Sequence, residues 1–242
     1  MSIPWIGAAA TVVVVGDFKP TRIHPKWLYE AGLISQADAL GSVVQAAVPG
    51  EVSVFRTDWF QCDVQSDRLT VVVADPADFE RLRDLVAGLL RSLTELQCQQ
   101  MGINRVVHLQ MGDAGQYNRV GDQLANNEIW AGTLLLPGMR NLTTWGVRPD
   151  LYGGRIQVQV EPSQKVKNGV YVAVNDHFDL TAVERQPTSR DEVPIRSDPE
   201  EDDRTANAAK TQRAITILME EWTESMRRAD EIIDHVGAMG KV

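Results

Sequence analysis

The strongest constraint on the fold is the apolar periodicity of two stretches, residues 75–96 and 205–236. In both, apolar residues recur at every third or fourth position, which places them along one face of an α-helix. Asp75 and Pro76 suit the N-cap and the first turn of the earlier helix. Because an apolar helical face must pack on another apolar layer, the two stretches predict long amphipathic helices that cover a sheet. The residues of these faces are Phe79, Leu82, Leu85, Val86, Leu89, Leu93 and Leu96 in the first helix, and Ile215, Leu218, Trp222, Met226, Ala229, Ile233 and Val236 in the second.

Runs of β-branched and aromatic residues, separated by turn-forming residues, predict the strands of that sheet. The clearest is Thr11-Val-Val-Val-Val15. The predicted strands lie at residues 11–15, within 51–64, and at 69–74, 103–111, 142–147, 155–160 and 170–174. Shorter helices are expected at residues 26–34, 36–40 and within 114–126. The fold class predicted from this pattern is α+β, with an antiparallel sheet and the long helices on one side of it.

The order of the predicted elements is similar in two halves of the chain, residues 1–100 and 101–242. Each half has a strand, a short helical segment, further antiparallel strands and a long amphipathic helix. This order indicates a pseudo-duplicated unit in one compact domain, and it resembles the TATA-binding-protein-like topology at the level of element order only. A likeness of fold carries no function by itself.

Residues 184–204 interrupt the pattern with three prolines, eight acidic residues and four arginines. Such a composition has too few apolar residues to build a core, so we expect a mobile acidic loop before the last helix. Two interpretations remain open. The loop is a linker, or it attracts a basic partner and becomes ordered on assembly.

The formal net charge of −9 argues against free nucleic acid as a partner, because phosphate binding needs concentrated lysine and arginine. Cys62 and Cys98 belong to no C-x-x-C motif, which fits buried thiols in a reducing compartment. The N-terminal apolar run lacks a basic region before it and is too short to span a bilayer. We therefore expect a cytoplasmic protein with no membrane partner.

Two histidines and three aspartates are the candidates for chemistry: His108, Asp113, Asp176, His177 and Asp179. If neighbouring strands bring them together, they would provide ligands for a divalent metal or a general acid–base pair. However, Asn and Asp are ordinary turn residues at strand ends, and a strand histidine is often half-buried. We favour this structural interpretation and assign no catalytic residue, metal site or cofactor. No phosphate-binding loop or nucleophile elbow is present.

Two other groups of residues are candidates for binding. Trp5 and Trp130 lie in predicted irregular segments, where an exposed tryptophan often marks a protein interface. Five arginines would line a ligand-binding cleft if the two halves bring them together. These are Arg105, Arg119, Arg140, Arg148 and Arg155.

Several short motifs together resemble a sporadically distributed bacterial protein family of uncharacterised function. They are Lys26-Trp-Leu28 with Gly32-Leu-Ile34, the strand pair within residues 55–73, Gly102-Ile-Asn104, and Trp222 with Ser225. Members of that family are sometimes encoded near mobile or defence-related genes. The resemblance implies a bacterial accessory protein and provides no catalytic residues.

Three functions are consistent with the sequence. The first is a non-enzymatic binding or assembly protein that docks on itself or on another protein, for example as an accessory subunit of an antiviral defence system. The second is a sensor or regulator that binds a small molecule or a nucleic-acid component between the two halves. The third is a metal-dependent hydrolase or nuclease built from the histidines and aspartates. The first is preferred because no catalytic motif is present.

Overall fold

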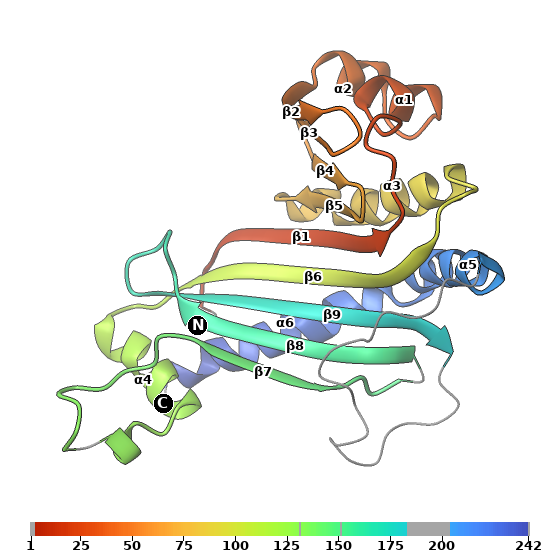
Figure 1. Cartoon of the computed structure of the whole chain (residues 1–242). Helices are drawn as coiled ribbons and strands as arrows, with labels where there is room; N and C mark the ends of the chain where they lie inside the picture. Colours follow the sequence, from red (N-terminus) through yellow and green to blue (C-terminus); the bar gives the residue numbers. More distant parts are fainter. Residues whose placement is uncertain (1–2, 131, 151, 183–203, 242) are drawn as a thin grey trace.

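The computed structural model describes residues 3–130, 132–150, 152–182 and 204–241 (Figure 1). These residues form one nine-stranded antiparallel sheet, in the order β2-β3-β4-β5-β1-β6-β9-β8-β7, together with six α-helices. The predicted α+β class with an antiparallel sheet is therefore confirmed. The strands are β1 (Trp5–Gly16), β2 (Val43–Val48), β3 (Val52–Arg56), β4 (Gln61–Gln65), β5 (Arg68–Val73), β6 (Cys98–Gln110), β7 (Leu142–Val147), β8 (Tyr152–Pro162) and β9 (Gly169–Ala182).

The two halves of the chain meet at the centre of the sheet. β1 and β6 pair antiparallel there, with Thr11 opposite Asn104 and Val12 opposite Ile103. The first half continues outward from β1 through β5, β4, β3 and β2, and the second continues from β6 through β9, β8 and β7. The sheet is therefore continuous across the sequence boundary between the halves.

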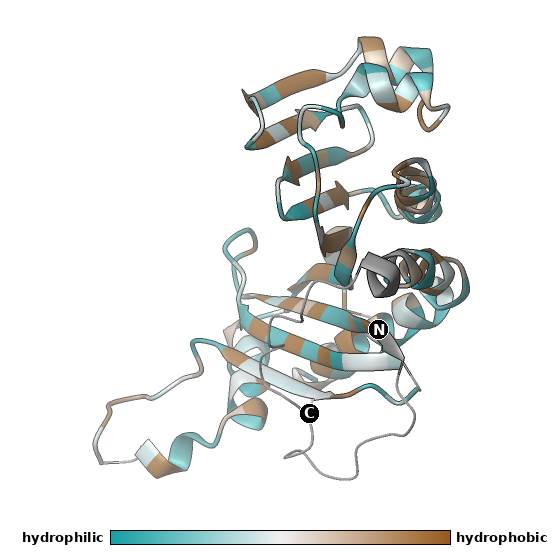
Figure 2. Ribbon diagram, turned by 45° about the vertical axis from the view of Figure 1, so that its right-hand side comes forward, coloured by the Kyte–Doolittle hydropathy of each residue, from teal (hydrophilic) through white to brown (hydrophobic). Residues whose placement is uncertain are grey.

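The two faces of the sheet differ because successive residues of a strand point to opposite sides. On β1, Ala10, Val12 and Val14 are buried, whereas the residues between them are less so. The helices α3, α5 and α6 lie behind this buried face (Figures 1 and 2). No helix of the described residues packs against the other face, which we call the open face. The helices are α1 (Pro25–Glu30), α2 (Gln36–Leu40), α3 (Phe79–Ser92), α4 (Ala114–Leu124), α5 (Arg204–Glu220) and α6 (Trp222–Met239).

The stretch predicted as one helix over residues 205–236 is two helices that meet at Glu221. The backbone hydrogen bonds continue across the junction, from Glu221 N–H to the Ile217 carbonyl and from Ser225 N–H to the Glu221 carbonyl, both at 2.8 Å. α5 packs on α3, β6 and β9, whereas α6 packs on β6, β9 and α4. The change of direction lets the two helices follow a sheet that twists.

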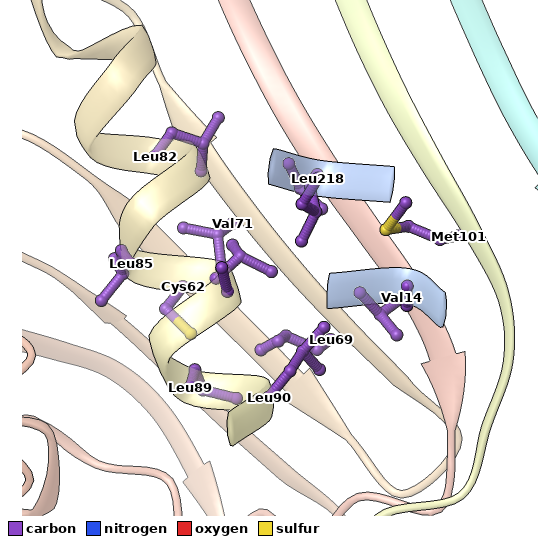
Figure 3. Close-up of a cluster of buried hydrophobic side chains, with 14 of the residues drawn as sticks. Val14, Cys62, Leu69, Val71, Leu82, Leu85, Leu89, Leu90, Met101 and Leu218 are labelled. Carbon is purple, nitrogen blue, oxygen red and sulfur yellow. The ribbon is translucent and has the colours of Figure 1, made fainter. Parts of the chain in front are cut away.

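The largest core cluster lies between α3, α5 and the strands of the first half. Figure 3 shows Leu82, Leu85, Leu89 and Leu90 of α3 facing the sheet, with Leu218 of α5 beside them. Each fully buried leucine contributes about 1.5–3 kcal/mol of hydrophobic stabilisation. A second cluster lies between α4, α6 and the strands β6, β8 and β9. The long helices therefore hold both halves together from one side.

The cysteines are buried in the core and form no disulfide, as predicted. Burial raises the pKa of the Cys98 thiol to about 11 and raises the pKa of the Cys62 thiol as well. Because the thiolate is the reactive form, neither side chain is suited to nucleophilic chemistry.

One strand lies outside the predicted set, and one predicted segment lies outside the described residues. β2 was not predicted, because all six of its residues are exposed and show no alternation between buried and solvated positions. The acidic stretch expected to be a mobile loop, residues 184–204, lies almost wholly outside the described residues. No helix of the described residues is both long enough and apolar enough to cross a membrane.

Candidate functional site

The two histidines proposed for chemistry lie on the open face but far apart along it. His108 pairs with Tyr171 across β6 and β9, and His177 pairs with Gly102. On β6, His108 is six positions along the strand from Gly102, the partner of His177, which corresponds to roughly 20 Å. His108 Nδ1 is 2.8 Å from Ser163 Oγ, and His177 Nε2 is 3.2 Å from Gln100 Oε1. Each histidine therefore has a local polar partner and neither contacts the other.

Only one of the three aspartates, Asp179, lies beside a histidine, and it does not bring His108 and His177 together. Asp113 caps α4, where its carboxylate accepts the Gln116 N–H at 2.7 Å. Asp176 is buried on the helix-covered face, whereas Asp179 lies on the open face beside the β9 position of His177. No cluster of metal-ligating side chains is found within the described part of the chain. The expected convergence does not occur, because odd and even residues of β9 point to opposite sides of the sheet.

The five arginines do not gather in one cleft either. Arg105 and Arg148 are buried on the helix-covered face, each in an ion pair, with Asp230 at 3.1 Å and with Asp150 at 2.6 Å respectively. Arg155 lies on β8 opposite His177, on the open face. The remaining two, Arg119 and Arg140, lie outside the sheet. Arg119 donates to the Gly240 carbonyl at 2.9 Å, and Arg140 is exposed. The predicted arginine cleft is therefore not formed, since the pleat separates Arg148 from Arg155.

A buried ionic network surrounds Asp176. Its carboxylate accepts Ser225 Oγ–H at 2.6 Å, Arg228 Nη1–H at 2.9 Å and a hydrogen bond from Arg148. Arg148 also donates to both carboxylate oxygens of Asp150, at 3.0 and 2.6 Å. Burial lowers the pKa of the Arg148 guanidinium, and Asp150 opposes that shift. The opposite charges of the network pair with one another and fasten α6 to β9.

The centre of the open face carries polar side chains from β6, β8 and β9. Asn104, Asn175 and Gln157 lie side by side across these three strands. Asn175 Oδ1 and His177 Nδ1 are buried atoms without a hydrogen-bond partner in the described structure. Burial lowers the pKa of His177, and the positive charge of Arg155 lowers it further. A neutral imidazole beside amides suits hydrogen bonding to a neutral polar group rather than ion binding.

The two tryptophans proposed for an interface occupy different environments. Trp5 is half-buried and packs against the second core cluster, with the Arg105 guanidinium 5.2 Å from its ring centroid. Trp130 is exposed, at the end of a 3-10 turn formed by Asn127–Trp130. Trp5 therefore packs within the fold, and only Trp130 is presented to a partner.

Trp130 belongs to a strongly apolar surface segment between α4 and β7. We call residues 127–130 and 132–139 the apolar loop. Five of the twelve large exposed apolar side chains of the described structure lie in it. Their exposed fractions are 68% for Ile129, 49% for Trp130, 53% for Leu134, 93% for Leu135 and 89% for Leu136. In Figure 1 this loop extends away from the sheet, beyond the end of α4.

Local interactions order the first part of this loop. Trp130 O accepts the N–H groups of Thr133 and Leu134, both at 3.0 Å. Asn127 Nδ2 donates to Asp122 Oδ1 of α4 at 2.8 Å. Leu136 has a positive φ of 52°, an uncommon conformation for a bulky side chain. The apolar side chains are therefore presented by a structured loop at the cost of some backbone strain.

A second, smaller apolar surface lies at the edge of the sheet. It consists of Leu40 of α2 and Val43, Val44 and Val48 of β2, all exposed. β2 pairs only with β3, so the hydrogen-bonding groups on its outer edge have no strand beside them among the described residues. An uncharged edge strand of this kind can pair with another strand.

The sequence contained a signal for the apolar loop that composition alone does not reveal. Leu134-Leu-Leu136 follows Trp130 within a stretch that has no helical or strand periodicity. Three consecutive leucines outside a regular element cannot all face one core, so they point to a partner surface. Trp130 was selected from the sequence, but the leucines were not.

Comparison with known protein families finds no family model that matches the chain, and no curated protein matches its sequence significantly.

Proposed function

We propose that this chain is a non-enzymatic binding or assembly protein that docks on another protein through its apolar loop. The observation that carries this proposal is the exposure of five large apolar side chains within one structured loop. Large exposed apolar patches on soluble proteins commonly mark interaction sites, and aromatic residues are frequent among the side chains that dominate binding energy. Trp130 and the three leucines are such side chains.

Electrostatics favours a protein partner over a lipid surface or nucleic acid. The chain carries a formal charge of −9, and Asp122, Glu128 and Glu161 lie in or near the apolar loop. Anionic headgroups and phosphates are repelled by such a surface. A protein with a complementary basic surface is attracted to it.

The setting we propose follows from the resemblance to a bacterial family sometimes encoded near defence genes. In this setting the chain is a cytoplasmic accessory subunit of an antiviral defence assembly, and it contributes binding rather than chemistry. The absence of an assembled catalytic cluster among the described residues is compatible with that role.

We further propose that the fold is a pseudo-duplicated unit with a TATA-binding-protein-like element order. This is supported by the sheet order, in which β1 and β6 are central and each half runs outward from its own first strand. It is also supported by the position of α3 and of α5 with α6, which cover the same face of the sheet. The halves differ in size, with four outer strands in the first and three in the second.

A comparison of two baits tests the proposed docking function. The wild-type chain and a variant with Leu134→Ser, Leu135→Ser and Leu136→Gly would be used to capture proteins from extracts of the source organism, with quantitative mass spectrometry as the readout. We expect a defined partner that the wild type captures and the variant loses. The variant must keep its melting temperature, which is expected because the replaced side chains are exposed.

Two results would contradict the docking proposal. Equal capture of every protein by both baits would place binding elsewhere on the surface. Flotation of the wild type, but not of the variant, with phosphatidylethanolamine–phosphatidylglycerol vesicles would assign the loop to a lipid surface. Light scattering measures the oligomeric state of both chains. Self-association through β2 would be retained by the loop variant, so it is distinguished from docking through the apolar loop.

A second candidate function is binding of a neutral polar ligand on the open face, over the strands β6, β9 and β8 of the second half. Asn175 Oδ1 and His177 Nδ1, which are buried without a hydrogen-bond partner in the described structure, support it. Thermal-shift screening against nucleosides and other uncharged polar molecules tests it, because a ligand that binds the native state raises its melting temperature. Absence of any shift removes this candidate.

A further inference from the structure

A cavity of about 330 Å³ lies at the base of the apolar loop, between α4, residues 136–139 and the ends of β8 and β9. Its size is close to the lower end of ligand pockets, which begin at about 300 Å³. Val120 and Val170 provide buried apolar walls, and Leu136 of the apolar loop is part of the same lining. The cavity can therefore hold one large apolar side chain.

The charged residues of the cavity lining are both acidic, Asp122 and Glu161. Each carboxylate is held by neutral amide groups. Asp122 accepts from Asn127 at 2.8 Å, and Glu161 accepts from Asn141 at 2.8 Å and from Gln159 at 3.0 Å. The ion pairs formed among the described residues involve neither carboxylate. Within this part of the chain, two oriented negative charges therefore lie beside an apolar cavity without a compensating cation.

Resting on the docking function proposed above, we propose that this cavity receives one large apolar side chain of the partner protein, from a segment in which lysine or arginine flanks that side chain. The apolar walls bind the anchor, and the carboxylates of Asp122 and Glu161 pair with the flanking cations. A segment with acidic flanks is rejected by the same charges, which gives the site its specificity.

The backbone of Leu136 supports a binding role for the rim of the cavity. A non-glycine residue with positive φ is strained, and such strain is often found at binding sites. Folding alone favours glycine or asparagine at this position. A leucine that is both strained and exposed contributes little to the fold but offers apolar surface at the cavity.

A fluorescein-labelled peptide of sequence Lys-Arg-Ala-Phe-Ala-Arg-Lys tests this inference by fluorescence anisotropy. Two matched peptides carry Ser in place of Phe, or Glu in place of every Lys and Arg. We expect the basic peptide with Phe to bind at least ~10-fold more tightly than either twin, a difference of about 1.4 kcal/mol. In NMR spectra, the amide signals of Gly121 and Gly138, which line the cavity, should shift on binding.

Charge variants of the chain provide a second test of the proposed cavity site. The pair Asp122→Asn and Glu161→Gln keeps the hydrogen-bond acceptors and removes both charges, so peptide affinity should fall about 5-fold or more with an unchanged melting temperature. The control pair Glu51→Gln and Asp67→Asn removes the same charge from exposed positions in the first half, and it should leave affinity unchanged. Equal loss in both pairs, or equal binding of all three peptides, would overturn the inference.

The outcomes separate this inference from the docking function. If the apolar-loop variant loses its captured partner while the basic peptide does not bind, docking stands and the cavity assignment fails. If the peptide binds as expected and no partner depends on the loop, the cavity assignment stands and the docking function fails.

Discussion

At the scale of single residues, the buried ionic network around Asp176 decides how α6 is fixed to the sheet. Asp176 accepts hydrogen bonds from Arg148, Ser225 and Arg228, and Arg148 also binds Asp150. Ser225 is one of the residues on which the family resemblance rests. Its buried hydroxyl donates to Asp176, which explains a serine at this buried position of α6.

Replacing one member of this network should be strongly destabilising. Arg148→Met leaves Asp150 and Asp176 with less compensating charge in a buried setting, and we expect a loss of about 3 kcal/mol in the free energy of unfolding. Arg148→Met combined with Asp176→Leu should cost less than the sum of the two single variants. Urea unfolding of the four chains measures this, and strictly additive losses would show that the pair is not coupled.

His177 should make stability depend on pH in a defined direction. Burial lowers its pKa in the folded chain below the unfolded value, so the folded state favours the neutral imidazole. The unfolded chain then binds more protons below about pH 6.5, and stability is lost as the pH falls through that region. His177→Gln should lose less stability than the wild type between pH 7 and 5, measured by urea unfolding. His235→Gln, at an exposed position of α6, is the control. An identical slope for wild type and His177→Gln would contradict this assignment.

At the scale of elements, the apolar loop gains little stability from packing, because its large apolar side chains are exposed. Leu136→Gly should relieve the positive-φ strain, and because the side chain is exposed little packing is lost. We expect the melting temperature to stay the same or to rise by the equivalent of about 1 kcal/mol, since glycine also costs unfolded-state entropy. Partner binding should weaken at the same time. Differential scanning calorimetry and the capture assay measure the two effects, and a clear drop in stability would argue that Leu136 serves the fold.

Elements that carry a capping signal or a run of strand-forming residues were predictable, even where they have no fully buried residue, as in α2 and β7. α2 begins at Gln36 after the predicted N-cap Ser35, because Ser35 and Asp38 form a capping box. β7 was predicted with its observed limits, whereas β1 begins at Trp5 and so extends before the predicted residues 11–15. β2 shows no alternation between buried and exposed residues, and it was not predicted. Gly154 of β8 has a φ of 110°, and a Cβ at this position would collide with the His177 carbonyl oxygen, so this position of the strand requires glycine.

The candidate site was less predictable than the fold, because it depends on which residues the pleat brings to one side. His108 and His177 share a face but not a position along it, and Asp176 lies on the opposite face. A shift of one residue in register would reverse these sides. Exposure of Leu134, Leu135 and Leu136 likewise follows from the tertiary structure and not from local periodicity.

At the scale of the whole molecule, the two halves should fold as one unit. β1 and β6 pair along most of their length, and Leu218 and Trp222 of the second half are in the core cluster of the first. We expect one cooperative urea transition by both tryptophan fluorescence and far-UV circular dichroism. Residues 1–96 and 97–242 expressed separately should aggregate, because each exposes a long central strand. Two resolved transitions, or two soluble folded halves, would contradict this prediction.

The apolar loop and the turn after α3 lie at opposite ends of β6, which spans roughly 40 Å. This separation allows a direct measurement of where a partner binds. A photo-reactive benzoylphenylalanine would be placed at Leu135 in the apolar loop, or at the exposed Thr94 as the control. Both chains would be irradiated in living cells of the source organism. If the loop is the docking site, position 135 should give a discrete cross-linked protein that is absent from position 94. Identical products at both positions, or no product at position 135, would contradict docking through the apolar loop.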